Sequence, residues 1–210
     1  MDNLKFIRSI IFISSIIGIL LIIFGNIKSP DNFRILSDLI QNLLIFNLIL
    51  VLFMPNYRLL KISFIVGIFT MVYDFFLETI AVNLNCWYPL GGTQFPPVII
   101  IPLEMIISFT IIGTSFSILL TFPEKIRSID FKSLNWIKSL FKNKRIDFFW
   151  RILMVLGNAI IGTNGDYSAG SDIWIPGPFW YPIYTFIIWF VGGVIILLVF
   201  SGLEKRIKDK

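Results

Sequence analysis

Six stretches of this chain are apolar over almost the whole length that a helix needs to cross a lipid bilayer. A membrane-spanning helix requires ~20 consecutive, mostly apolar residues. The fifth stretch is the most interrupted, because it contains Asn158 and Thr163. The predicted helices cover about residues 6–24, 35–54, 62–82, 98–120, 148–164 and 177–201.

The composition supports a membrane bundle. Of the 210 residues, 56% are hydrophobic and 15% are charged. A soluble core of this size cannot bury so much apolar surface, so the excess is expected to face lipid. We therefore predict an all-α fold, a polytopic membrane bundle of about six transmembrane helices that forms a single integral membrane domain over residues 1–210.

The basic residues predict an orientation. If the N-terminus is cytoplasmic, every Lys and Arg except Lys28 and Arg34 falls on the cytoplasmic side, so the positive-inside rule places both termini inside the cell membrane. The net charge of +5 follows from this asymmetry. It indicates membrane lipid as the partner of the basic residues and argues against nucleic acid.

The longest predicted cytoplasmic connection covers about residues 124–147. It contains "FKSLNWIKSLFKNKR", in which Leu134, Ile137 and Phe141 recur at helical spacing between lysines. Such a pattern predicts an amphipathic helix lying on the inner leaflet. A helix that binds a protein partner is the alternative, and the sequence leaves open whether the chain forms homo- or hetero-oligomers.

The residue inventory excludes several kinds of chemistry within this chain. There is no His, and Cys86 is the single Cys. A histidine or multi-thiolate metal site, a Ser-His-Asp triad and a Cys-His nucleophile therefore have no residues to form them. Phosphate-cradling Gly-rich loops are missing too, and no metal or redox cofactor is expected.

Carboxylates are the remaining reactive groups. Asp74 and Glu78 lie four residues apart in the third predicted helix, and the rise of ~1.5 Å per residue brings Glu104 of the fourth to a similar depth. Asp38 is expected on the same, outer side, and Asp166 and Asp172 in the last outer loop. Charged carboxylates are costly in hydrocarbon, so at least one of the first three is expected to be protonated near pH 7.

Aromatic side chains surround these acids in the predicted topology. An aromatic belt at the membrane interface explains any one of them. Together with a protonated acid, however, they indicate a cavity that protonates an alkene and stabilises a carbocation. The predicted cavity residues are Trp87, Tyr88, Trp174, Trp180, Tyr181 and Tyr184.

The two outer loops have similar sequences. "CWYPLGG" (residues 86–92) and "IWIPGP" (residues 173–178) share Trp-x-Pro followed by Gly, and each lies between two predicted helices. Interfacial Trp and Pro can recur by chance. The alternative is a weak internal parallel repeat, of the kind found in membrane proteins.

Two segments resemble integral membrane proteins of carotenoid biosynthesis. The segment from Asp74 through "WYP" to "IPLEM" resembles the lycopene-cyclase domain, in which an acidic helix leads through a Trp-containing loop to a helix opening with Pro-Leu-Glu-Glu. Glu104 matches the first Glu, and Met105 stands in place of the second. The stretch "IWIPGPFWYPIYTFIIWFVGG" is similar to the carotenoid hydratases. The resemblance implies an enzyme that modifies isoprenoids.

Three functional interpretations follow. The first is acid-initiated cyclisation or hydration of a polyprenyl or carotenoid-like lipid, with Glu104 and Glu78 as the favoured proton donors and Asp74 sharing or tuning the proton. The second is the substrate-binding membrane subunit of an uptake transporter, whose acids and aromatics enclose a cationic solute. In the third, Asp74 and Glu78 only form structural hydrogen bonds between helices.

Overall fold

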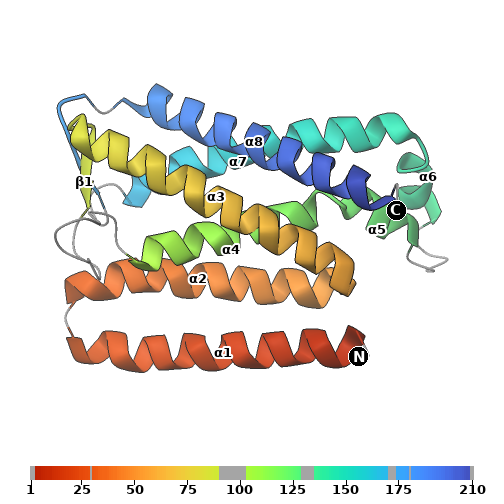
Figure 1. Ribbon diagram of the computed structural model, residues 1–210, viewed down its shortest axis with the longest axis horizontal. Helices are drawn as coiled ribbons and strands as arrows, with labels where there is room; N and C mark the ends of the chain where they lie inside the picture. Colours follow the sequence, from red (N-terminus) through yellow and green to blue (C-terminus); the bar gives the residue numbers. More distant parts are fainter. Residues whose placement is uncertain are drawn as a thin grey trace.

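The computed structural model describes residues 3–28, 30–89, 103–128, 135–169, 174–179 and 181–208. Within these residues the regular secondary structure is helical apart from one pair of three-residue strands, with short turns between the elements (Figure 1). The elements are α1 (Asn3–Lys28), α2 (Pro30–Phe53), α3 (Tyr57–Asn83), β1 (Trp87–Pro89), α4 (Leu103–Leu119), α5 (Phe122–Ser128), α6 (Asn135–Leu140), α7 (Lys144–Ala169), β2 (Trp174–Pro176) and α8 (Pro182–Lys208).

A long helix occupies each of the six apolar stretches, as predicted, although residues 98–102 lie outside the described part. Four of these helices, α1, α3, α7 and α8, are long and apolar enough to cross a membrane. α4 and α5 provide a fifth span if they count as one helix bent by 47°, and the apolar helix Asp38–Phe53 of α2 is shorter. The chain is therefore a multi-pass membrane protein by the length and composition of its helices.

The helices pack side by side around a core between α3, α4, α7 and α8. Neighbouring pairs are α1 with α2, α2 with α4, α4 with α3, α3 with α8, and α8 with α7. Val66, Phe116, Val155, Ile196 and Phe200 are buried together where the last four helices meet. Large apolar side chains also cover the outside of the bundle, as expected for a surface that faces lipid.

Two glycines allow α3 and α4 to approach each other closely. A Cβ atom at Gly67 would collide with the Thr110 carbonyl oxygen and the Thr114 hydroxyl, and one at Gly113 would collide with the Thr70 side chain. Small residues at a helix crossing let backbones come into contact, which is a common way of packing membrane helices.

We expect Gly67→Val to destabilise the bundle by about 1–3 kcal/mol, because the new side chain must push α4 away from α3. The measurement is the thermal unfolding midpoint of the purified protein in detergent. Gly18→Val is the matched control, since a Cβ atom at Gly18 has no neighbour within 4 Å. Equal midpoints for the two variants would contradict the proposed close contact.

The two Trp-x-Pro segments meet at one end of the bundle. β1 and β2 are antiparallel, with Trp87 opposite Pro176 and Pro89 opposite Trp174. The Gly177 N–H then donates to the Cys86 carbonyl oxygen at 2.7 Å. A Cβ atom at Gly177 would collide with the Asn85 carbonyl oxygen, so this contact requires glycine. The two loops lie at the same end of the bundle, as the sequence predicted.

The opposite end of the bundle holds both termini together with α5 and α6, which are the described helices of the predicted cytoplasmic connection (Figure 1). A continuous helix through residues 131–145 is not formed: α6 ends at Leu140, and α7 begins at Lys144 after a turn. Leu134 lies outside the described residues. Whether this segment rests on lipid stays a prediction.

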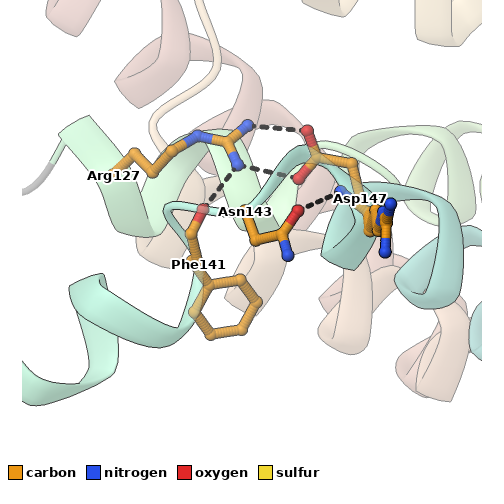
Figure 2. Close-up of polar contacts among 5 residues, drawn as sticks. Arg127, Phe141, Asn143 and Asp147 are labelled. Atoms are coloured by element: carbon orange, nitrogen blue, oxygen red, sulfur yellow. Dashed lines mark hydrogen bonds and ion pairs between the residues drawn. The ribbon is translucent and has the colours of Figure 1, made fainter.

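Arg127 explains why the chain turns here. Its guanidinium donates to both carboxylate oxygens of Asp147, at 2.8 and 3.0 Å, and to the Phe141 carbonyl oxygen at 2.9 Å (Figure 2). The Asn143 side chain accepts a hydrogen bond from the backbone N–H of Arg145 in the first turn of α7. Arg127 thus links α5, the turn after α6 and the beginning of α7.

Candidate functional site

The predicted acidic pair on α3 faces the inside of the bundle. Asp74 and Glu78 are one helical turn apart, so they lie on the same face of α3. They are only 5% and 7% exposed. Two buried carboxyl groups in a membrane helix are costly unless polar groups surround them. The neighbouring helices supply such groups.

The carboxyl groups line a small cavity between α3, α4, α7 and α8. Its volume is about 30 Å³. Asp166 of α7 completes a set of three acids around it, and Asn158 lies on the same helix. The other polar lining residues are Thr70 and Tyr73 of α3, Thr185 and Trp189 of α8, and Trp87 of β1.

Two tryptophans each hold one of the acids. The indole N–H of Trp87 donates to Glu78 Oε2 at 2.5 Å, and that of Trp189 donates to Asp166 Oδ2 at 2.6 Å. Asn158 donates in turn to the Trp189 carbonyl oxygen at 3.2 Å. Asp74 differs from the other two acids, because its Oδ2 is buried and has no hydrogen-bond partner among the described residues.

Packing fixes the position of Trp189. A Cβ atom at Gly162 would collide with the Trp189 indole, so the absence of a side chain there lets the ring lie against α7. On its other side the ring stacks on Phe109 of α4, with centroids 5.5 Å apart. Trp189 is therefore held between two helices with its N–H on Asp166.

A second, larger cavity lies directly beside the polar one. It has a volume of about 490 Å³ and an almost wholly apolar lining from α3, α8 and the segment before and in β1. Tyr73, Trp87 and Ile188 line both cavities, so they form the wall between them. The remaining lining residues are Phe76, Leu77, Ile80, Ala81, Leu84, Cys86, Phe179 and Tyr184.

The apolar cavity opens on the side of the bundle. Phe76, Ile80, Leu84, Phe179 and Tyr184 of its lining are all exposed. Phe76 and Ile80 belong to α3 and Tyr184 to α8, two helices that are long and apolar enough to cross a membrane. The cavity therefore opens on the outside of the bundle between α3 and α8.

The predicted site residues are only partly brought together. Trp87 lines both cavities, and Tyr184 lines the apolar one. Glu104 lies in the first turn of α4, half-buried, and lines neither cavity. Tyr181 is exposed and packs edge-on against Tyr184, at 5.5 Å between ring centroids.

Three further aromatic predictions lie partly or wholly beyond the described structure. Tyr88 and Trp174 are placed by their backbones in the strand pair, and their side chains are outside the described part. Trp180 and Asp172 lie outside the described residues altogether.

Asp166 corrects the expected topology. The sequence placed it in the last outer loop, but α7 continues to Ala169, so Asp166 is helical and faces the polar cavity. A signal for this was present in the sequence: Asn158, Gly162 and Asp166 recur at intervals of four, which puts them on one helix face. Trp189 was not among the predicted cavity residues, although it lies in the stretch that resembles the carotenoid hydratases.

The fold and the site define a class of protein: a multi-pass membrane helix bundle with a small acidic cavity beside an apolar cavity that opens on the outside of the bundle. Comparison with family models, curated proteins and solved structures finds no match to this chain. The described residues contain no group of three His, Cys, Asp or Glu side chains arranged to hold a metal ion.

Proposed function

We propose that this chain is an integral membrane enzyme that protonates a carbon–carbon double bond of an isoprenoid lipid and so initiates cyclisation or hydration. One observation carries the proposal: an apolar cavity that opens on the outside of the bundle shares a wall with a cavity that holds three carboxyl groups. An apolar substrate would reach such a site from the bilayer, and the acids lie behind the wall against which its double bond would rest.

In the proposed reaction, Glu78 is the proton donor. Its carboxylic acid transfers a proton to one carbon of a terminal double bond, which leaves a tertiary carbocation on the substrate and a carboxylate on the enzyme. In cyclisation, a second double bond attacks the cation, and the loss of a neighbouring C–H proton to the carboxylate restores the acid. In hydration, a water molecule attacks the cation instead, and the proton that this water then loses returns to the Glu78 carboxylate. Neither reaction consumes a cofactor.

Trp87 has two roles in this proposal. Its N–H bond to Glu78 Oε2 holds the acid in the polar cavity, directly behind the wall that Trp87 forms with the apolar cavity. The indole must turn away from Glu78 when substrate binds, so that the acid can reach the double bond. Its π face, with that of Tyr73, is then available to the carbocation.

The cavity dimensions favour an enzyme over the substrate-binding subunit of an uptake transporter. A cage for a cationic solute needs a polar pocket of some hundreds of Å³ that opens to water. Here the polar cavity is only about 30 Å³ in volume, whereas the large cavity is apolar. The available space therefore suits an apolar ligand.

Six spans, with both termini on the cytoplasmic side of the cell membrane, form the topology that we propose for the enzyme. The shared end of the two termini supports it, since the basic residues concentrate there. Equal spacing supports a parallel repeat: β1 begins 30 residues after the start of α3 (Tyr57 to Trp87), and β2 begins 30 residues after the start of α7 (Lys144 to Trp174).

Expression in a lycopene-accumulating bacterial host tests the proposed function. We expect lycopene to be converted to a pigment with a shifted absorbance spectrum, which chromatography and mass spectrometry would assign as an isomer of lycopene or its hydrate. A host with the empty vector is the control. Unchanged lycopene in cells that contain folded protein in their membranes would remove carotenoids as substrates.

A further inference from the structure

Asp74, which lines the small polar cavity, carries an acceptor that the described residues do not satisfy. Its Oδ2 is buried without a hydrogen-bond partner among them, and the residue is only 5% exposed. A buried polar atom without a partner costs about 1–3 kcal/mol, so its persistence points to a bound group that the protein atoms do not include.

The charges around the cavity specify what that group must be. The lining contains three carboxyl groups, Asp74, Glu78 and Asp166, and no Lys or Arg. Trp87 and Trp189 each give a hydrogen bond to one acid, but these bonds add no positive charge. A small cation would satisfy the Asp74 oxygen and also offset the negative charge of the group.

The volume limits the cation further. A space of about 30 Å³ accommodates one or two water-sized bodies and no organic solute. A divalent ion such as Mg²⁺ keeps several of its waters, so it is too large when hydrated. No three described acids converge on a metal position, so an ion bound here must use hydroxyl and amide oxygens as well as a carboxylate. A bare monovalent ion of sodium size fits this space.

The lining supplies oxygen ligands of the kind that such an ion prefers. Asp74 provides its unpartnered oxygen. Thr70 also lines the cavity; its hydroxyl donates to the Val66 carbonyl oxygen at 2.9 Å, so its oxygen can still act as an acceptor. Asn158 uses its amide nitrogen on Trp189, which leaves the amide oxygen as its ligand atom. Hard cations bind such carboxylate, hydroxyl and amide oxygens.

We propose that the cavity between α3, α7 and α8 is a binding site for one Na⁺ ion, with Asp74 as its principal ligand. This site is additional to the proposed catalysis and does not depend on it. Na⁺ balances the single charge of Asp74, whereas Asp166 and Glu78 are each held by a tryptophan N–H, and Glu78 keeps its proposed role beside the apolar cavity.

The test measures stability and ion binding in the purified full-length protein in detergent. Thermal unfolding is followed at constant pH and ionic strength in NaCl, KCl or choline chloride. We expect NaCl alone to raise the unfolding midpoint, by on the order of 5 °C near saturation. Radioactive ²²Na⁺ should bind saturably at one site per chain, and excess unlabelled Na⁺ but not choline should displace it.

Two variants locate the effect. Asp74→Asn is expected to abolish both the sodium-dependent shift and ²²Na⁺ binding. Asp147→Asn, which removes a carboxylate at the other end of the bundle, should keep both. If Asp74→Asn does not fold, the wild-type ²²Na⁺ measurement decides alone. Equal midpoints in the three salts together with no saturable ²²Na⁺ binding would overturn the proposal and leave water as the occupant.

Discussion

Glu78→Gln is expected to lower the conversion of lycopene by about 100-fold or more, in the range found when a general acid is removed. Glutamine has almost the same size and shape as glutamate, and its amide oxygen can still accept the Trp87 N–H bond. The variant should therefore fold but lack the proton that begins the reaction. The measurement is the ratio of product to lycopene per amount of membrane-inserted protein.

Glu104→Gln is the matched control for this experiment. Glu104 is the other acid that the sequence favoured as donor, and it lines neither cavity. We expect this variant to keep most of the wild-type conversion. If Glu104→Gln loses conversion while Glu78→Gln retains it, the donor is Glu104 and the proposed geometry of catalysis is wrong. Trp87→Phe is a third variant for this experiment. It removes the indole hydrogen bond to Glu78 but keeps the carboxylic acid itself.

The inward face of α3 was predictable because helical periodicity is a local property. A spacing of four residues puts Asp74 and Glu78 on one face in any α-helix, and the energetic cost of charge in lipid turns that face inward. The long helices were predictable for the same reason, since runs of apolar residues extend over whole helices. These features need no knowledge of neighbouring helices.

For Glu104, helical rise predicts the depth in the membrane but not the direction in which the side chain points. Counting residues gives its depth in the membrane, and depth alone brought it close to Asp74 and Glu78. The direction of a side chain around the helix axis depends on how α4 packs, and at that crossing Gly67 and Gly113 bring the backbones together. Two acids at equal depth can therefore face different parts of the bundle.

Asp166 was misplaced because hydropathy is an incomplete guide to helix length. Thr163, Asn164 and Gly165 lower the apolar character of the chain just before it. The helix nevertheless continues to Ala169 and packs against α8, and Trp189 there satisfies the carboxylate. This hydrogen bond is a tertiary contact between two helices, so a hydropathy window along the sequence does not reveal it. The pairing of β1 with β2 was unpredictable in the same way.

Ile80→Trp tests the other half of the proposed site, the apolar cavity. Ile80 lines the cavity and is 58% exposed at its opening between α3 and α8. A larger ring there occupies space that the substrate needs, whereas substitutions at exposed positions usually change stability by less than about 0.5 kcal/mol. We expect conversion to fall by about 10- to 200-fold, the range for a change of shape in an apolar pocket, with the unfolding midpoint nearly unchanged.

Ile160→Trp is the matched control for Ile80→Trp. Ile160 is also an apolar, 53% exposed residue of a membrane helix, but it lies on α7 and lines neither cavity. Its substitution should leave conversion within about twofold of wild type, since exposed substitutions away from a site are usually near neutral. If both tryptophans lower conversion equally, the loss reflects a general effect on the membrane surface. If Ile80→Trp alone lowers it, substrate reaches the acid through the opening between α3 and α8, because that opening is what the new ring fills.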